Sequence, residues 1–292
     1  MSENQKKENI WPLFVMGTQR SGTTFLTRVL SAHKYIFVQN EAELPCIFDG
    51  EKNPIILINN IKSELASNEN INIDEFIHNG CKVWGLKDPQ LTEHIAVLKY
   101  FLPHSKFIVI LRDGRGVANS YMENKWGLGT NAYTGAIRWK NEVQQQLAFM
   151  KTMPENFFLI KFEDLLQDLE SSMKSACNFL DVEFDAEMLN YNKQESYYEM
   201  KKQNVHTFKK PDIQLTKKWQ QKLSEHEIDV IECVAGDILD DFGYMRVGKP
   251  IKIGRLEKFY YRLHQSIIGE IQIQYKWRRF RIMDAILKFR ER

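Results

Sequence analysis

The chain has 292 residues, of which 43% are hydrophobic and 27% are charged, as is ordinary for a folded soluble protein. Its length fits one large α/β domain or two small ones. Its net charge is only +2 at pH 7, which excludes a general attraction to nucleic acid, so any anion site has to come from local clusters of charge.

Strands and helices alternate along the chain. Short apolar runs bounded by turns predict strands at residues 11–16, 34–40, 82–86, 106–111 and 157–160. Helical spacing of apolar residues, or composition, predicts helices over residues 23–32, within 53–80, from the turn after 111 to 121, and over 163–180. This order predicts a central parallel sheet covered by helices on both faces, with ligands bound where the strands end.

The turn after the first strand, residues 17–24 (GTQRSGTT), has the GxxxxG spacing of a phosphate-binding loop. A nucleotide triphosphatase carries a lysine after the second glycine, but Thr23 stands there. The nearest cation is Arg20, upstream in the loop. The pattern favours a site for a 5′-phosphate, and alone it also fits a turn that merely starts a helix.

A second basic turn follows the strand at residues 106–111. Arg112 comes directly after that strand, and Ser120 lies two helical turns further on. An arginine and a hydroxyl at this place can bind a second, separate phosphate. An arginine after one strand is usually part of a surface ion pair, but two phosphate loops in this order favour a shared nucleotide.

The two loops together carry a family resemblance. RSGTT at 20–24 and RDGRGVANSY at 112–121 resemble the 5′-phosphosulfate and 3′-phosphate loops of sulfotransferases that use 3′-phosphoadenosine 5′-phosphosulfate (PAPS). The likeness is strongest to the branch of tyrosylprotein sulfotransferases and related bacterial enzymes, and it covers roughly residues 13–244. It implies a P-loop-like fold and an enzyme that transfers a sulfuryl group from PAPS to an acceptor hydroxyl.

The resemblance also implies the chemistry of the site. Glu41 matches the general base of the tyrosylprotein branch, with Glu43 as the fallback, although a glutamate here also fits a helix start. Lys87 matches the lysine of the family's KDP motif, which contacts the transferred group. Without the resemblance Lys87 would pass for a surface residue. Arg20 is the third predicted catalytic residue and the second cation.

Further contacts with the donor follow from the same resemblance. The predicted set is Arg20, Ser21, Gly22, Thr23, Thr24, Phe25, Arg112, Ser120, Phe162, Lys217, Lys218 and Trp219. Phe25 fits an adenine contact or a helix core, and Phe162 stands where relatives often carry a tyrosine. Glu43 and Asn124 replace substrate-guiding arginines of the tyrosylprotein branch. The predicted acceptor is therefore a carbohydrate, a glycolipid or a small alcohol rather than a peptide tyrosine.

The carboxyl-terminal segment differs from the rest of the chain. Residues 252–292 hold eleven Lys or Arg and four Asp or Glu, a net charge of +7, interleaved with aromatic residues. We predict a basic helical extension over 249–292, after a sulfotransferase domain at 11–248. It can lie on an anionic membrane surface, bind an acidic partner or pack on its own domain. The sequence predicts no oligomeric state.

The remaining features concern compartment and metals. Cys46, Cys81, Cys177 and Cys233 are far apart, which favours free thiols in a reducing compartment. Residues 1–10 are polar, are expected to form a disordered tail and show no secretory signal. We expect a cytoplasmic protein, in contact at most with a membrane surface, that needs no metal. A kinase with a degenerate loop and a non-catalytic nucleotide- or polyanion-binding protein stay as alternatives.

Overall fold

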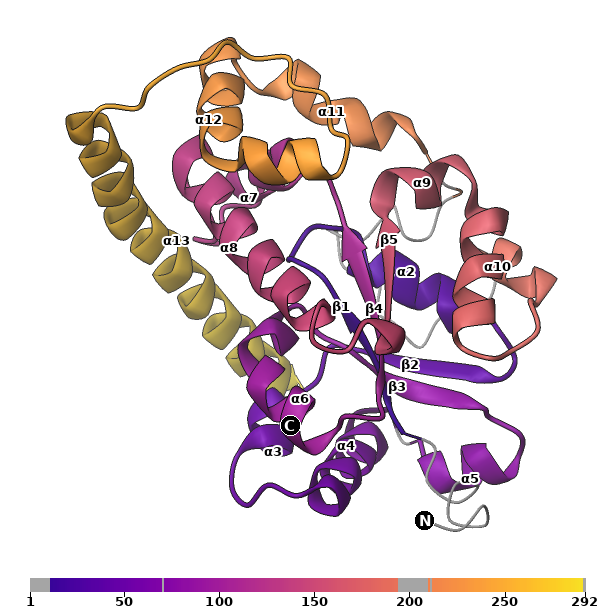
Figure 1. The fold of residues 1–292 in the computed structure, drawn as a ribbon. Helices are drawn as coiled ribbons and strands as arrows, with labels where there is room; N and C mark the ends of the chain where they lie inside the picture. The colour runs from indigo at the N-terminus through magenta and orange to yellow at the C-terminus, as the bar shows by residue number, and fades with distance from the viewer. Residues whose placement is uncertain (1–10, 70, 194–209, 211, 291–292) are drawn as a thin grey trace. The chain divides into compact units, whose positions relative to one another are not determined.

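A parallel five-stranded sheet forms the centre of the computed structural model, which describes residues 11–69, 71–193, 210 and 212–290 (Figure 1). The tail predicted at 1–10 lies outside them. The strands are β1 (Leu13–Met16), β2 (Ile36–Asn40), β3 (Val83–Lys87), β4 (Lys106–Leu111) and β5 (Phe157–Lys161), in the order β2-β3-β1-β4-β5. All neighbouring strands pair in parallel, which confirms the predicted sheet.

Helices fill the connections between the strands. Before β4 they are α2 (Thr23–Leu30), α3 (Leu44–Phe48), α4 (Pro54–Glu69), α5 (Ile73–His78), the 3₁₀-helix η1 (Pro89–His94) and α6 (Ile95–Phe101). After β4 they are α7 (Gly114–Asn124), α8 (Ala132–Met150), η2 (Pro154–Asn156), α9 (Phe162–Gln167), α10 (Leu169–Phe179) and η3 (Ala186–Asn190). The last three are α11 (Gln214–Lys222), α12 (Glu225–Asp241) and α13 (Arg255–Arg290).

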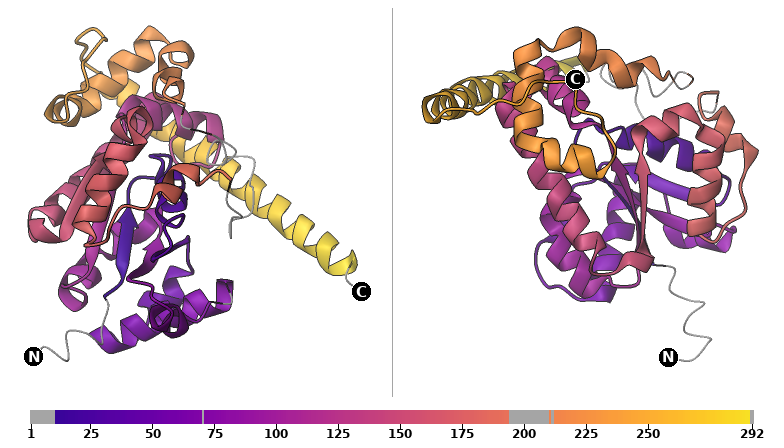
Figure 2. Two further views of the ribbon diagram at one scale, coloured as in Figure 1. Left: turned by 90° about the vertical axis from the view of Figure 1, so that its right-hand side faces the viewer. Right: turned by 45° about the horizontal axis from the view of Figure 1, so that its top comes forward.

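Helices cover both faces of the sheet. Successive side chains of each strand point to opposite faces, so each strand contributes apolar side chains to both layers. Phe14 and Met16 of β1 belong to a buried cluster with residues of α4, α6 and the end of α8. The opposite face of the sheet packs against α2 and α10. The two views in Figure 2 show helices on either side of the strands. Burial on both faces explains why the strands read as continuous apolar runs.

Asp168 divides the helix that the sequence predicts over 163–180. Its backbone is not helical (φ −141°, ψ 85°), and its carboxylate accepts a hydrogen bond from the backbone N–H of Ser171. Asp168 therefore caps α10 and separates it from α9, because an aspartate at a helix start satisfies N–H groups that lack a partner. Apolar spacing continues across the break and does not reveal it.

The chain divides into two compact units. Unit 1 consists of Met1–Arg112 and Val143–Ile213 and contains the sheet, and unit 2 consists of Asp113–Glu142 and Gln214–Arg292. The carboxyl-terminal segment thus clusters with α7, α11 and α12, and α13 confirms that it is helical. Among the described residues, no helix is both long enough and apolar enough to cross a membrane.

Candidate active site

The carboxyl ends of the five parallel strands meet at one edge of the sheet in unit 1. Gly17 follows β1, Glu41 follows β2, Asp88 follows β3, Arg112 follows β4 and Phe162 follows β5. Ligands of open parallel sheets bind at this edge. The residues predicted from the first phosphate loop, from the KDP motif and from the end of β4 therefore share one location.

The loop between β1 and α2 leaves the start of the helix open to an anion. Both the backbone N–H and the hydroxyl of Ser21 donate to the carbonyl oxygen of Thr18, at 3.1 and 2.6 Å, which closes the turn. Gly22 occupies the N-cap position with φ 101° and has no side chain to cap the helix. The first N–H groups of α2, from Thr23 and Thr24, thus lie where helices bind phosphate groups.

Arg112, which follows β4, and Phe162, which follows β5, pack against this loop. A Cβ atom on Gly22 would lie 2.4 Å from Cδ2 of Phe162, so the ring packs directly on the glycine. The guanidinium of Arg112 lies 4.8 Å from the centroid of the same ring and donates a hydrogen bond of 2.9 Å to the carbonyl oxygen of Arg20. Arg20 itself has a left-handed backbone, with φ 72°. The two predicted donor-binding arginines are thus in direct contact with each other.

Lys87 and Glu41 form an ion pair beside the loop. Lys87 is the last residue of β3 and its side chain is completely buried, whereas half of the Glu41 side chain is exposed. The Lys87 ammonium donates to Oε1 of Glu41 at 3.3 Å. The backbone N–H of Glu41 also donates to the carbonyl oxygen of Lys87 at 2.7 Å. A cation and a carboxylate therefore lie together at the edge of the sheet where a transferable group and a hydroxyl can meet.

Asp88 fixes the turn that follows Lys87. It accepts hydrogen bonds from the backbone N–H groups of Gln90, at 2.7 Å, and Ala42, at 3.4 Å, and so links η1 to the segment after Glu41. Burial raises the pKa of the Asp88 carboxyl above its ordinary value. Asp88 thus supports the site by holding backbone in place.

Glu43, the fallback base, differs from Glu41 in its surroundings. Its backbone N–H donates to Oε1 of the buried Glu64 at 2.8 Å, and Glu43 itself is exposed at the start of α3. The carboxylate that pairs with Lys87 is that of Glu41.

Phe25 lies within α2 and is 5% exposed. Its ring contacts that of Tyr191 edge to face, with centroids 5.3 Å apart. These contacts fit the helix-core alternative for Phe25. The adenine contact stays a prediction.

Four further predicted donor contacts lie in unit 2. Ser120 is half-buried in α7. Lys217 and Lys218 are exposed on α11, where Lys218 forms an ion pair of 2.7 Å with Glu123. Trp219 is buried in the core of unit 2. The donor-binding roles of these four residues stay predictions.

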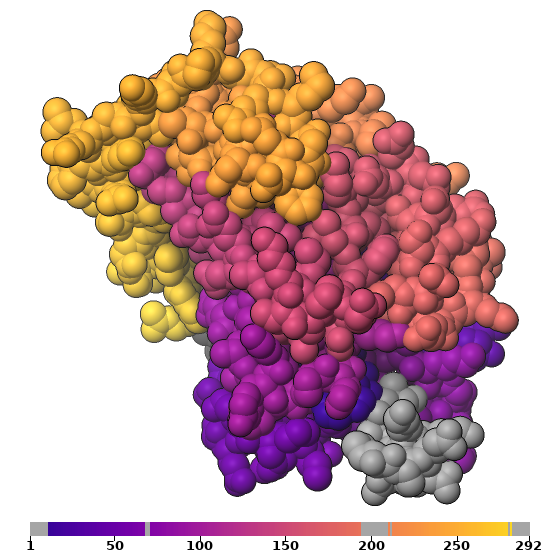
Figure 3. All heavy atoms as spheres, viewed as in Figure 1, coloured from indigo at the N-terminus to yellow at the C-terminus, as the bar shows by residue number. Residues whose placement is uncertain are grey.

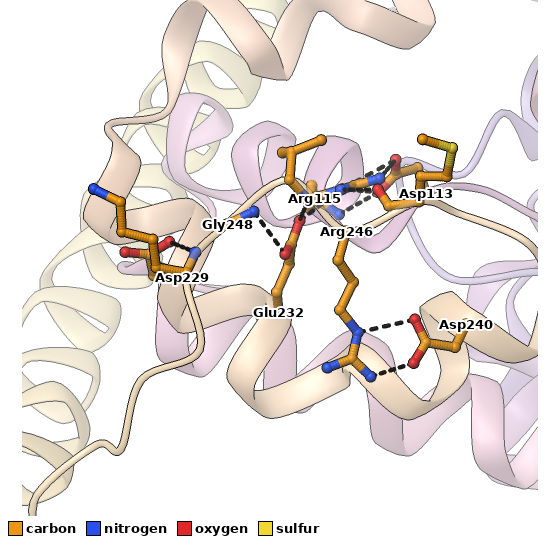
Figure 4. Close-up of polar contacts among 10 residues, drawn as sticks. Asp113, Arg115, Asp229, Glu232, Asp240, Arg246 and Gly248 are labelled. Carbon is orange, nitrogen blue, oxygen red and sulfur yellow. Dashed lines mark hydrogen bonds and ion pairs between the residues drawn. The ribbon is translucent and has the colours of Figure 1, made fainter.

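A buried charge cluster beneath Trp219 was not singled out from the sequence. Arg115 lies with its guanidinium 4.2 Å from the Trp219 ring and forms ion pairs with Asp113, at 2.8 Å, and Glu232, at 2.6 Å (Figure 4). Burial opposes the charge of Arg115, but the hydrogen bonds that it donates to the Asp113 and Glu232 carboxylates raise its pKa above the usual value. Glu232 also accepts the backbone N–H of Gly248. The one local signal in the sequence is the close spacing of Asp113 and Arg115 in RDGR, which is compatible with an ion pair between them.

No group of three or more His, Cys, Asp or Glu side chains that could hold a metal occurs among the described residues. The cations at the sheet edge in unit 1 are arginine and lysine side chains.

Comparisons with known proteins agree on one family. A model of the sulfotransferase family matches residues 12–186. The chain is 24% identical to protein-tyrosine sulfotransferase A of Caenorhabditis elegans over 269 residues, 83% of this chain and 70% of the relative. It is 21% identical to protein-tyrosine sulfotransferase 1 of Danio rerio over 271 residues, 83% of this chain and 75% of the relative.

Solved structures show the same fold. The sulfotransferase domain from the curacin biosynthetic pathway superposes with a TM-score of 0.61 at 17% identity, covering 81% of this chain and 99% of that domain. The sulfotransferase domain from the Synechococcus PCC 7002 olefin synthase gives 0.54 at 17% identity, covering 76% and 93%. Since the family model spans more than half of the chain, this chain belongs to the sulfotransferase family and is an enzyme that transfers a sulfuryl group from PAPS to an acceptor.

Proposed function

We propose that the acceptor is an uncharged hydroxyl compound, namely a carbohydrate, a glycolipid or a small alcohol, and that Glu41 is its general base. The observation that carries the proposal is the pairing of the Glu41 carboxylate with the Lys87 ammonium at the carboxyl edge of the sheet. The half-exposed carboxylate is accessible to an acceptor, and the buried ammonium is fixed in position.

Sulfuryl transfer, like phosphoryl transfer, proceeds by in-line attack on a centre whose charge is spread over its oxygens. In the proposed reaction Glu41 takes the proton of the acceptor hydroxyl as its oxygen bonds to sulfur. Lys87 stabilises negative charge on the oxygens of the transferred group. The bond between sulfur and the bridging phosphate oxygen breaks, and adenosine 3′,5′-bisphosphate leaves.

The remaining cations bind the donor in this proposal. Arg20 and the start of α2 hold the 5′-phosphosulfate, while Arg112 holds the 3′-phosphate. The contact between the Arg112 guanidinium and the carbonyl of Arg20 supports the assignment, because it couples the two arginines. The open N-cap at Gly22 fits a donor phosphate group in the same way.

Charge near Glu41 supports an uncharged acceptor. Glu43, two residues further on, is exposed, and so are Asp49 and Glu51 after α3. An exposed carboxylate two residues from the proposed base repels an anionic acceptor and leaves a neutral hydroxyl compound unaffected.

Peptide tyrosine is the second candidate, because the curated relatives are named protein-tyrosine sulfotransferases. Incubation with radiolabelled PAPS and a panel of sugars, glycolipids, alcohols and tyrosine peptides separates the two. We expect label on neutral hydroxyl compounds, and label on tyrosine peptides alone would disprove the proposed acceptor class. Glu43→Arg should raise the labelling of an acidic tyrosine peptide without raising that of a neutral alcohol. The cytoplasmic location expected from the sequence is part of the same proposal.

A further inference from the structure

One side of helix α13 packs on the rest of unit 2. The side-chain amide of Gln265 accepts a hydrogen bond from the backbone N–H of Thr130, at 2.8 Å, and donates one to the carbonyl of Gly127, at 2.7 Å. Gln272 accepts the N–H of Gly127 at 3.0 Å. On the same side of the helix the Tyr261 ring stacks on that of Tyr133, with centroids 5.4 Å apart, so hydrogen bonds and an aromatic contact together hold this side of α13 inward.

The opposite side of α13 is apolar and exposed. Leu256, Tyr260, Leu263, Ile267 and Ile271 follow one another at intervals of four, three, four and four residues, which places them on one side of a helix. The five side chains range from 45% exposed at Leu263 to 86% at Leu256. Together with Phe259 they form what we call the outer apolar face. Figure 3 shows the side chains of this helix, in gold and yellow, at the molecular surface.

Basic side chains accompany the outer apolar face. Arg255, Lys258 and Arg262 are exposed on the same helix, and Arg278, Arg279 and Arg281 extend the series. Between residues 255 and 281 the only acidic residues are Glu257 and Glu270. Residues 252–292 carry a net charge of +7, and because the whole chain carries +2, the first 251 residues carry −5. Positive charge is thus concentrated on the helix that exposes apolar side chains.

We infer that the outer apolar face of α13 binds an anionic lipid surface. Contiguous exposed apolar side chains indicate an interaction site, and a helix with an apolar face and many Lys and Arg side chains lies in the interface of a membrane that contains acidic lipids. Charge selects this occupant over a second copy of the chain, because pairing two such helices brings two segments of charge +7 together. The inference involves neither PAPS nor an acceptor and is separate from the proposed function.

Vesicle sedimentation with the full-length protein tests the inference. The probes are vesicles of phosphatidylcholine alone and of phosphatidylcholine with about 30% phosphatidylserine, an anionic lipid. The double variant Leu263→Gln/Ile267→Gln leaves the charge unchanged and removes two side chains of the outer apolar face. Lys258→Gln/Arg262→Gln removes two charges. The matched control is Ile55→Gln/Tyr100→Gln, which removes two exposed apolar side chains from unit 1. Circular dichroism melting checks that each variant is folded.

We expect the wild-type chain and the control to bind the phosphatidylserine vesicles equally, and to bind pure phosphatidylcholine more weakly. The Leu263/Ile267 variant should bind at least about tenfold more weakly, because it loses two aliphatic side chains that membrane binding would bury. The Lys258/Arg262 variant should lose most of the preference for phosphatidylserine. The inference would be overturned if the wild-type chain bound neither kind of vesicle, or if the Leu263/Ile267 variant bound as tightly as wild type. A wild-type dimer that this variant dissociates, without vesicle binding, would instead make the face an interface between two copies.

Discussion

The ammonium of Lys87 lies 3.3 Å from Oε1 of Glu41, and the carbonyl oxygen of Lys87 accepts the backbone N–H of Glu41. Two hydrogen bonds therefore join the end of β3 to the residue that follows β2. The backbone bond fixes the position of Glu41 independently of its side chain. The backbone of Glu41 is left-handed, with a φ of 64° that is uncommon for a residue with a Cβ atom. A change of the carboxylate alone can therefore test chemistry without moving the backbone.

Glu41→Gln should lower kcat by ~10²-fold or more while leaving the affinity for the donor unchanged, as expected for loss of a general base. Glutamine keeps the size of the side chain and can still accept the hydrogen bond from Lys87, but it cannot take a proton at neutral pH. Steady-state kinetics with PAPS and titration with adenosine 3′,5′-bisphosphate measure the two quantities separately.

Glu43→Gln is the matched control, because it removes the same charge two residues away at a side chain that is exposed. It should keep kcat within a few-fold of wild type. Loss of activity in Glu43→Gln with full activity in Glu41→Gln would transfer the role of base to Glu43.

Lys87→Met should reduce kcat by ~10²-fold or more without lowering the melting temperature, because methionine fills the buried site without a charge to desolvate. Glu41 is left without this ammonium, but its half-exposed carboxylate stays solvated. Thermal unfolding followed by circular dichroism and a radiolabelled PAPS assay measure the two effects. Unchanged kcat in a folded variant would remove Lys87 from the mechanism.

The sheet and the two basic turns were predictable because both depend on local sequence. Strands buried on both faces are continuous apolar runs, and Arg20 and Arg112 stand directly beside such runs. The pairing of Glu41 with Lys87 is not local. It follows from the register of β2 on β3, in which Asn40 lies opposite Lys87. A single sequence does not encode that register in any short pattern, so the geometry that separates Glu41 from Glu43 needed the structure.

Two other features escaped prediction for the same physical reason. The partner of Arg115, Glu232, lies 117 residues away, and neither residue carries a mark of burial in the sequence. In α13 the apolar spacing is visible, but apolar spacing normally indicates an inward face. The hydrogen bonds of Gln265 and Gln272 with the segment around Gly127 reverse that orientation.

Activity should persist in excess EDTA, and added magnesium should not raise it. In the proposed mechanism Arg20 and Lys87 supply the positive charge that a metal supplies in phosphoryl transfer. The radiolabelled PAPS assay before and after chelation measures this. Inactivation by EDTA with recovery on addition of magnesium would show that the two side chains do not suffice.

Arg112→Ala should weaken the binding of adenosine 3′,5′-bisphosphate at least tenfold, because a charge-assisted contact contributes ~1.5–3 kcal/mol. Arg20→Ala should do the same at the other phosphate. Arg112→Lys should fall between wild type and Arg112→Ala, since lysine keeps the charge but loses the planar group that stacks on Phe162 and donates to Arg20.

Isothermal titration calorimetry measures these affinities. Lys99→Ala is the control, because it removes one exposed positive charge from α6, the helix that precedes the amino end of β4. Equal affinities for Arg112→Ala and Lys99→Ala would eliminate Arg112 as a phosphate ligand.

Gly22→Ala should destabilise the protein by about 1–3 kcal/mol and weaken donor binding, because the new Cβ atom meets Phe162 and the backbone has φ 101°. Urea unfolding distinguishes the two causes when it is repeated with Phe162→Leu and with the double variant. The smaller leucine relieves the clash but not the backbone strain, so the double variant should be more stable than the sum of the single changes predicts, by at least ~0.5 kcal/mol. Strict additivity would mean that the ring does not confine the loop. If the double variant instead regains both stability and donor affinity, the packing of Phe162 on Gly22 determines the shape of the phosphate site.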